Sequence, residues 1–264
     1  MAIQELLVKN LKVSFLTPEK ELLAIRGISY ELNRDETLAV VGESGCGKTV
    51  SALSILRLLE EPPGKIVSGE IFFDGKDLLK MSKKELQTYR GKDIAMIFQD
   101  PMTSMNPVLT IGEQIIETLL RHTSCSRKEA MNKTLKLLDQ VEIPSPKEKL
   151  DQYPHQLSGG MRQRAMIAMA LSCDPRILIA DEPTTALDVL TQGQILYLLK
   201  KIKKETKMSI LLITHDVGVV AEMARRVMVM YAGEIVESGP VREIFSSPRH
   251  PYTIGLMKSL PTLE

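Results

Sequence analysis

The sequence lacks the features that mark several protein classes. It has only three cysteines, Cys46, Cys125 and Cys173, and no C-x-x-C pair, so neither a disulfide framework nor a zinc or iron–sulfur cage is supported. Its 34 lysines and arginines nearly balance its 33 aspartates and glutamates. The overall basic field that holds a nucleic acid is therefore missing, and we expect no nucleic-acid partner.

Long apolar runs are missing as well. The start, MAIQELLVKN, has no basic segment followed by an apolar core, and no stretch approaches the roughly 18 apolar residues of a membrane helix. We therefore expect a chain that neither crosses a membrane nor is exported by itself, in a reducing cytoplasm. What the sequence does have is 44% hydrophobic residues over 264 positions, enough for a sizeable buried core.

Four short apolar runs predict the strands of a parallel sheet in an α/β fold. They read TLAVVGES, IAMIFQD, RILIADE and SILLITHD, and each ends in a polar cluster. Their hydrophobicity is continuous, as expected for a sheet covered by helices on both faces. Because ligands bind beyond the carboxyl ends of such strands, the runs predict one site containing Gly42, Gln99, Asp181, Glu182 and His215.

The remaining segments predict two further layers. Residues 1–35 and the stretch GEIFFDGKDL have short alternating runs, typical of an antiparallel β-subdomain. The region from about 100 to 172 contains helix starts and no convincing strand, which predicts an inserted helical subdomain. Capped helix starts are expected at Ser82, Ser126 and Ser145, and Ile195, Leu198, Leu199 and Ile202 follow the spacing of a helix with one buried face.

The segment GESGCGKT, residues 42–49, matches the phosphate-binding pattern G-x-x-x-x-G-K-[ST] between a strand and a helix. Glycines let successive backbone N–H groups cradle phosphate oxygens, while Lys48 reaches the β- and γ-phosphates and Thr49 ligates Mg²⁺. This P-loop NTPase core predicts ATP and Mg²⁺ as cofactors; an ordinary glycine-rich turn is the alternative. The expected nucleotide contacts are Gly42, Glu43, Ser44, Gly45, Cys46, Gly47, Lys48, Thr49 and Val50.

Polar residues at the other strand ends predict hydrolysis. Asp181 is expected to hold the Mg²⁺ and Glu182 to polarise the attacking water. Gln99 can contact both the metal and that water, and His215 can hydrogen-bond the γ-phosphate. An Asp-Glu-Pro turn that merely caps a helix is the alternative for the two carboxylates. His122, His155 and His250 are expected to be surface residues without a role.

A second anion receptor is predicted at LSGGMRQR, residues 157–164. Ser158 followed by Gly159 and Gly160 has the form of a helix N-cap with exposed N–H groups. One nucleotide already has its cradle in the same chain, so we expect two subunits to pair head to tail, each offering this helix start to the other's γ-phosphate. An ordinary capped helix is the alternative.

With these motifs in view, the sequence resembles an ABC-type ATPase subunit over nearly its whole length. The resemblance implies a Walker A loop at 42–49, a Q-loop at Gln99, the signature LSGGM, a Walker B strand ending in Glu182 and a switch histidine at His215. It also implies that Asp188 of the segment TALD forms the D-loop and that Phe15 stacks on adenine. For Phe15, an ordinary core position is the alternative.

Within that family, FQDPMTSMNPVLTIGEQI, YPHQLSGGMRQR, EPTTALDV and RHPYTIGLMKSLP are similar to segments of the ATP-binding subunits of oligopeptide, dipeptide and nickel importers. This implies an ATPase domain at 1–239 with a C-terminal extension at 240–264. It also implies a peripheral protein on the cytoplasmic face of a prokaryotic cell membrane. The implied partners are membrane permease subunits, a second homologous ATPase and, indirectly, an extracellular solute-binding protein.

Several alternatives stay open at this point. The cargo is either peptides or nickel or a metal chelate, and the pair is either a homodimer or a heterodimer. Many peptide-type members continue into a cysteine-rich tail, so the sequence ending at Glu264 belongs to a shorter branch or is a piece of a longer chain. A soluble ABC ATPase without a permease and a non-enzymatic nucleotide-binding module are the competing functions.

Overall fold

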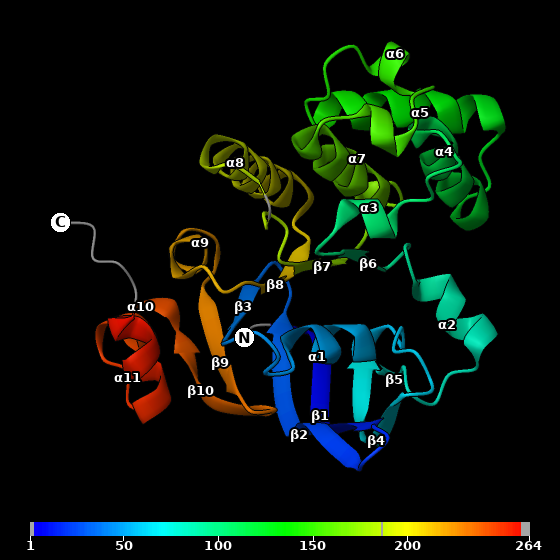
Figure 1. Cartoon of the computed structure of the whole chain (residues 1–264). Coiled ribbons are helices and arrows are strands. Elements are labelled where there is room, and N and C mark those ends of the chain that lie inside the picture. The colour runs from blue at the N-terminus through cyan, green and yellow to red at the C-terminus, as the bar shows by residue number, and fades with distance from the viewer. Residues whose placement is uncertain (1–2, 186, 260–264) are drawn as a thin grey trace. The chain divides into compact units, whose positions relative to one another are not determined.

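The computed structural model describes residues 3–185 and 187–259. The chain divides into two compact units, which are described separately. The first unit comprises residues 1–86 and 209–264, and the second comprises residues 87–208. Helix α2 (Lys83–Tyr89) runs across the boundary (Figure 1).

The first unit contains most of the strands. They are β1 (Gln4–Leu16), β2 (Glu21–Asn33), β3 (Thr37–Val41), β4 (Gly64–Phe73), β5 (Lys76–Asp77), β8 (Ser209–Ile213), β9 (Arg226–Tyr231) and β10 (Glu234–Pro240). Its other helices are α1 (Lys48–Ile55), α9 (Val217–Met223), α10 (Val241–Ser246) and α11 (Pro251–Lys258).

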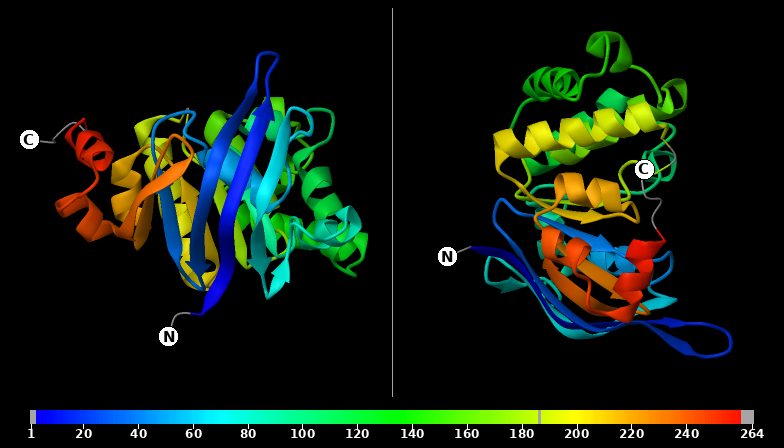
Figure 2. Two further views of the ribbon diagram at one scale, coloured as in Figure 1. Left: turned by 90° about the horizontal axis from the view of Figure 1, so that it is seen from below. Right: turned by 90° about the vertical axis from the view of Figure 1, so that its left-hand side faces the viewer.

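An antiparallel sheet in the order β2-β1-β4-β5 forms one layer of the first unit. Strands β1 and β2 make a long hairpin that extends past their neighbours (Figure 2). The inward side chains Leu6, Val8, Leu11 and Val13 are fully buried. The prediction of an antiparallel layer from residues 1–35 and GEIFFDGKDL is therefore confirmed.

The order β10-β9-β3-β8 forms the other sheet of this unit. Strand β3 pairs in parallel with both β8 and β9, whereas β10 pairs antiparallel to β9. All five residues of β3 and all five of β8 are buried, as continuous apolar strands require. Because β3 runs directly into residues 42–47 and then α1, the sheet fixes where the glycine-rich loop begins.

The segment that follows Gly239 packs on this sheet. Helix α10 contacts β9, β10 and α9, and Val241 and Ile244 lie in a buried cluster with Val227 and Val229 of β9. Burial of each such aliphatic side chain contributes about 1.5–3 kcal/mol. The segment after Gly239 therefore forms part of the folded unit up to residue 259; residues 260–264 lie outside the described part.

The second unit is mostly helical. Its helices are α3 (Pro101–Ser104), α4 (Ile111–His122), α5 (Arg127–Gln140), α6 (Pro146–Lys149), α7 (Gly159–Leu171) and α8 (Val189–Thr206), with a 3₁₀ turn at Pro154–Gln156. Two parallel strands, β6 (Ile94–Ile97) and β7 (Ile177–Asp181), complete it. Helix α7 contacts α3, α4, α5, α8 and β6, so it is the element around which the others pack (Figure 1).

Helix caps were predicted in part correctly. Ser126 and Glu129 form a capping box at α5, and Ser82 and Glu85 make the same reciprocal bonds at α2. At Ser145 the predicted helix start is present, since α6 begins at Pro146, but the predicted side-chain cap is not: the φ of 50° is left-handed, and the backbone carbonyl of Ser145 accepts the N–H groups of Glu148 and Lys149. A side-chain cap needs extended backbone at that position.

The long helix α8 confirms the spacing read from the sequence. Ile195, Leu198, Leu199 and Ile202 are at most 1% exposed. Over residues 3–185 and 187–259, no helix combines the length and apolarity needed to cross a lipid bilayer.

Candidate functional site

The glycine-rich loop of the first unit has a backbone that only glycine adopts easily. Gly42, Gly45 and Gly47 have φ values of 154°, 79° and 107°. A Cβ at Gly42 would lie 2.2 Å from the carbonyl oxygen of Met230, and one at Gly47 would lie 2.6 Å from Cδ1 of Ile25. The loop is therefore packed too closely on β9 and β2 to accept side chains at these two positions.

Lys48 is folded back over this loop. Its side chain is buried, with 6% of the residue exposed, and its Nζ donates to the carbonyl oxygens of Gly42 and Glu43, both at 2.8 Å. The ammonium thus lies at the centre of the curve formed by residues 42–47. A cation held there, beside the N-terminus of α1, makes the loop an anion receptor.

The other residues of the loop differ in their exposure to solvent. Glu43, Ser44, Gly45 and Thr49 are exposed, and Val50 is half-buried in the first turn of α1. Cys46 is buried at 7% exposure, and burial raises the pKa of its thiol despite the nearby Lys48. The exposed rim is where a phosphate chain can approach, whereas Cys46 has a packing role.

Two other predicted residues lie in the first unit. His215 is exposed and lies two residues after the end of β8, between that strand and α9. Phe15 is half-exposed near the end of β1, where it pairs with Leu22 and Gly64. A half-exposed ring is available for stacking, which a buried core position would not allow.

In the second unit, β7 ends in two carboxylates of different character. Asp181 is 2% exposed, whereas Glu182 is half-exposed and has a φ of 47°. Left-handed backbone at a residue other than glycine is uncommon and costs about 1–3 kcal/mol, and such strain clusters at functional sites. Because of this turn, the Glu182 side chain leaves the backbone in a different direction from that of a residue in a continuing strand.

One oxygen of Glu182 is held by two donors. Gln99 Nε2 donates to Oε2 at 3.1 Å, and the Thr185 hydroxyl donates to the same oxygen at 2.8 Å. Gln99 and Glu182, which the sequence assigned to one site, are therefore brought together at adjacent strand ends. The contact from Thr185 was not foreseen, although its position three residues after Glu182 is typical of a turn that closes on itself.

The LSGG segment forms the helix start that the sequence predicted. Ser158 has extended backbone, and its Oγ accepts the N–H of Met161 at 3.3 Å. Ser158 and Gly159 are exposed, and Gly160 is half-buried. The first turn of α7 thus faces solvent, and its N–H groups and dipole favour an anion.

Asp188 lies beside this helix start and caps α8. Its carboxylate accepts the N–H of Thr191 at 3.0 Å and the Thr191 hydroxyl at 2.7 Å, and these bonds lower the pKa of Asp188. A Cβ on Gly160 would come within 2.7 Å of Cγ2 of Thr191. Thr191 therefore joins Asp188 to the signature helix; Ala186, in the same TALD segment, lies outside the described residues.

Two side chains of α7 that the sequence reading missed connect this helix to its neighbours. Gln163, 2% exposed, donates through Nε2 to the carbonyl oxygen of Pro183 at 2.6 Å. Arg164 donates to the carbonyl oxygen of Val141 at 2.7 Å and to Gln194 Oε1 at 3.2 Å. Gln163 therefore links α7 to the turn that carries Glu182. The contacts of Gln163 and Arg164 explain why polar residues of the MRQR run occur in a largely buried helix.

The predicted residues thus form two groups. The first unit holds the phosphate loop, Phe15 and His215, and the second holds Gln99, Asp181, Glu182, Asp188 and the Ser158 helix start. Within the described ranges, no three His, Cys, Asp or Glu side chains come together as a metal site. A magnesium ion, which takes few protein carboxylates and completes its shell with water and phosphate oxygens, fits a donor set of this kind.

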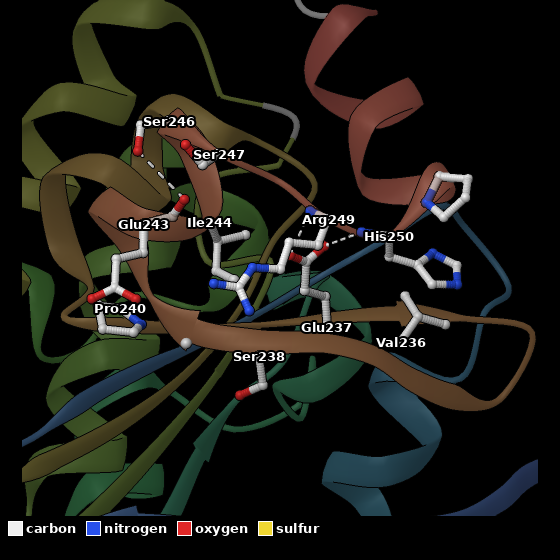
Figure 3. A pocket seen from close by; sticks show the side chains of 12 residues that line it. Val236, Glu237, Ser238, Pro240, Glu243, Ile244, Ser246, Ser247, Arg249 and His250 are labelled. Atoms are coloured by element: carbon white, nitrogen blue, oxygen red, sulfur yellow. Dashed lines mark hydrogen bonds between the residues drawn. The ribbon is translucent and has the colours of Figure 1, made fainter.

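A separate pocket lies in the C-terminal part of the first unit. It has a volume of about 650 Å³, and β10, α10 and the following turn line it (Figure 3). Glu237 accepts the backbone N–H groups of Arg249 at 2.9 Å and His250 at 3.1 Å beside it. His250, expected to lack a role, also caps α11, because its Nδ1 accepts the N–H of Tyr252 at 3.2 Å.

Comparison with known families gives two matches on this chain. The model described as ABC transporter matches residues 25–185. A second, described as oligopeptide/dipeptide transporter, C-terminal region, matches residues 236–264.

Characterised relatives cover nearly the whole chain. The oligopeptide transport ATP-binding protein OppD of Bacillus subtilis is 56% identical over 257 residues, which are 97% of this chain and 72% of OppD. The dipeptide transport ATP-binding protein DppD of the same organism is also 56% identical, over 97% of this chain and 77% of DppD. Among solved structures, the dimeric post-hydrolysis state of the ATP-binding cassette MJ0796 bound to ADP and Pi has a TM-score of 0.80 at 29% identity, and the match covers 90% of this chain and 99% of that chain.

Proposed function

The chain belongs to the ABC transporter family, and from this premise we propose that it hydrolyses ATP to drive the import of oligopeptides or dipeptides. The observation that carries the peptide assignment is the match of residues 236–264 to the C-terminal region of oligopeptide and dipeptide transporters. The relatives named for oligopeptide and dipeptide transport support it. Nickel or a metal chelate remains the alternative cargo.

In this proposal the first unit binds the nucleotide. The backbone N–H groups of residues 42–50 and the ammonium of Lys48 hold the phosphates, and the ring of Phe15 stacks on adenine. Lys48 is already held at the concave side of the loop by the Gly42 and Glu43 carbonyls. Thr49 and His215 supply a hydroxyl to Mg²⁺ and a hydrogen bond to the γ-phosphate, respectively.

The second unit supplies the groups that act on water. When bound, Mg²⁺ neutralises phosphate charge, and Asp181 and Gln99 are its proposed ligands in this unit. Glu182 Oε2 accepts two hydrogen bonds, which orient the carboxylate while leaving it able to take a proton from water. Glu182 is therefore the proposed general base, with Gln99 and Thr185 fixing its direction.

The Ser158 helix start and Asp188 are proposed to serve a second ATPase subunit. Ser158 and Gly159 at the helix start are exposed, and the Ser158 side chain accepts the N–H of Met161. The dimer of the cassette MJ0796, which shares this fold, supports pairing. We propose that each subunit presents Ser158, Gly159 and Gly160 to the γ-phosphate bound by the other.

A role in transport implies partners besides the second ATPase subunit. We propose that the chain sits at the cytoplasmic face of the membrane on permease subunits, that an extracellular solute-binding protein delivers the peptide, and that no nucleic acid is bound. The nearly neutral charge, +1 in formal terms, supports the last point.

Transport by the assembled complex in proteoliposomes tests the proposal. Internal ATP should drive uptake of labelled di- and pentapeptides, and Glu182→Gln in the same complex should abolish it. Uptake of nickel but not of either peptide, dependent on ATP and on Glu182, would replace the peptide assignment with the metal one. ATP turnover without uptake of any solute would favour a soluble ATPase.

A further inference from the structure

The C-terminal extension reaches the phosphate loop through one hydroxyl. Tyr252, in the first turn of α11, accepts the backbone N–H of Glu43 at 3.0 Å. Both residues belong to the first unit, although 209 positions separate them in the chain. No phosphate-binding motif predicts this contact.

The peptide unit between Gly42 and Glu43 is held on both sides. Its N–H, that of Glu43, donates to Tyr252, and its carbonyl oxygen, that of Gly42, accepts Lys48 Nζ at 2.8 Å. Because a peptide unit is planar and rigid, fixing its N–H restrains the orientation of the Gly42 carbonyl. The carbonyl oxygen of Glu43, in the next peptide unit, also accepts Lys48 Nζ at 2.8 Å. The Tyr252 hydroxyl therefore acts on the group that places the Lys48 ammonium.

Tyr252 is itself firmly positioned. Its ring packs against Tyr231 with centroids 4.5 Å apart, and it borders the buried cluster of Val227, Val229 and Ile244. Its backbone N–H is capped by His250. A hydroxyl on so restrained a ring has little rotational freedom to lose when it accepts a hydrogen bond.

The support extends to the turn before α11. The Glu237 carboxylate accepts the N–H groups of both Arg249 and His250, as the dashed lines in Figure 3 show. A second contact comes from the β9–β10 turn, where the Gly233 N–H donates to the Cys46 carbonyl at 3.0 Å. The loop is thus held by α11 and by the β9–β10 turn, and β10 supports the start of α11.

We propose that Tyr252 is a positioning residue for ATP binding, through which the C-terminal extension holds the Glu43 peptide and Lys48 in the nucleotide-binding arrangement. The inference rests on the proposed role of residues 42–50 as the phosphate cradle. Tyr252 acts through Glu43 and takes no part in the chemistry.

Tyr252→Phe tests the proposal because it removes the hydroxyl and keeps the ring. Loss of one neutral hydrogen bond should weaken MgATP affinity by about two- to tenfold. The KM for ATP should rise equally, with kcat at saturating ATP and the melting temperature unchanged. Amide exchange of the peptide containing Glu43, measured by mass spectrometry without nucleotide, should become faster.

Two controls separate the possible failures. Tyr231→Phe removes a hydroxyl from the stacked ring but leaves the bond to Glu43, so it should match the wild type in all five measurements. Lys48→Ala should abolish ATP binding; if it does not, the cradle assignment itself is wrong. If Lys48→Ala abolishes binding while Tyr252→Phe leaves both affinity and exchange unchanged, or lowers only the melting temperature, the role of Tyr252 is overturned.

Discussion

At the scale of single residues, the site depends on side chains whose backbone or surroundings are unusual. Glu182 combines a left-handed φ of 47° with two donors on one carboxylate oxygen. Such strain persists only where neighbouring contacts impose it. Gln99 and Thr185 hold the Glu182 carboxylate, so their effect on turnover should be smaller than that of Glu182 itself.

Glu182→Gln should lower kcat for ATP by about 10²- to 10⁴-fold, because an amide cannot accept the proton of the attacking water. ATP affinity should change by no more than a few-fold, since the phosphate cradle is untouched. Steady-state phosphate release and nucleotide titration measure the two quantities. Thr185→Val is the matched variant, and its kcat should fall by about tenfold or less. A larger loss in Thr185→Val than in Glu182→Gln would contradict the assignment.

Tyr30 predicts a loss of stability at alkaline pH. It is buried in β2 with its hydroxyl 3.3 Å from Ser51 Oγ, and burial raises its pKa from 10.0 to about 12. The folded state thus holds the proton more tightly than the unfolded state. The contribution of the protonated Tyr30 to the free energy of unfolding is complete below pH 10. As the pH rises towards 12 this contribution is lost, which lowers the free energy of unfolding by up to about 3 kcal/mol. Urea unfolding at pH 9 and 11 should show this decline in the free energy of unfolding, and the decline should be smaller in Tyr30→Phe. An equal decline in both proteins would exclude this role of Tyr30.

At the scale of elements, α7 joins the parts of the second unit. The start of α7 carries the signature. Gln163 donates to the carbonyl oxygen of Pro183, the residue after Glu182, and Gly160 packs against Thr191 of α8. Thr191 is in turn held by Asp188. A substitution in the signature, at residues 158–160, should therefore alter the position of Asp188 through Thr191, even when no nucleotide is bound.

Gly160→Ala should destabilise the protein by about 1–3 kcal/mol, because the new Cβ would lie 2.7 Å from Cγ2 of Thr191. Thr191→Ser removes that methyl group and keeps the hydroxyl bonded to Asp188. The double variant should therefore recover most of the lost stability. Urea unfolding of the wild type, both single variants and the double variant forms a complete cycle. Additive effects would show that this contact does not restrict position 160.

The same elements show what could be predicted from the sequence. Continuous apolar runs identified β3, β6, β7 and β8, because buried parallel strands need no polar face. Strand β9 has a similar apolar composition, but it ends in Tyr231 and lacks the polar cluster that marks the ends of the other four. The Ser145 cap failed since Ser-Pro-x-Glu fits a cap by composition, whereas the left-handed backbone depends on the preceding turn. The links from Gln163 and Tyr252 are tertiary contacts of ordinary side chains, and no local pattern encodes them. The bond from Thr185 is local, since Glu182 lies three residues before it.

At the scale of the whole molecule, one chain carries both of the proposed anion receptors. The phosphate loop belongs to the first unit, and the Ser158 helix start belongs to the second. One γ-phosphate could be shared either within a chain or between two chains. Val189 and Leu190, next to Asp188, are 85% and 80% exposed, and such apolar exposure is typical of a surface that is covered in an assembly.

Linked pairs of the chain distinguish these arrangements. In a split pair, one copy carries Lys48→Ala and the other Ser158→Arg; in a clustered pair, one copy carries both substitutions and the other none. If Ser158 acts on the neighbour's nucleotide, the split pair keeps one intact site and the clustered pair keeps none. We expect the split pair to hydrolyse ATP at about half the rate of the unsubstituted pair, the figure for one of two equivalent sites, and the clustered pair to be inactive. The reverse pattern, measured by phosphate release with the permease present, would place both receptors on the nucleotide of a single chain.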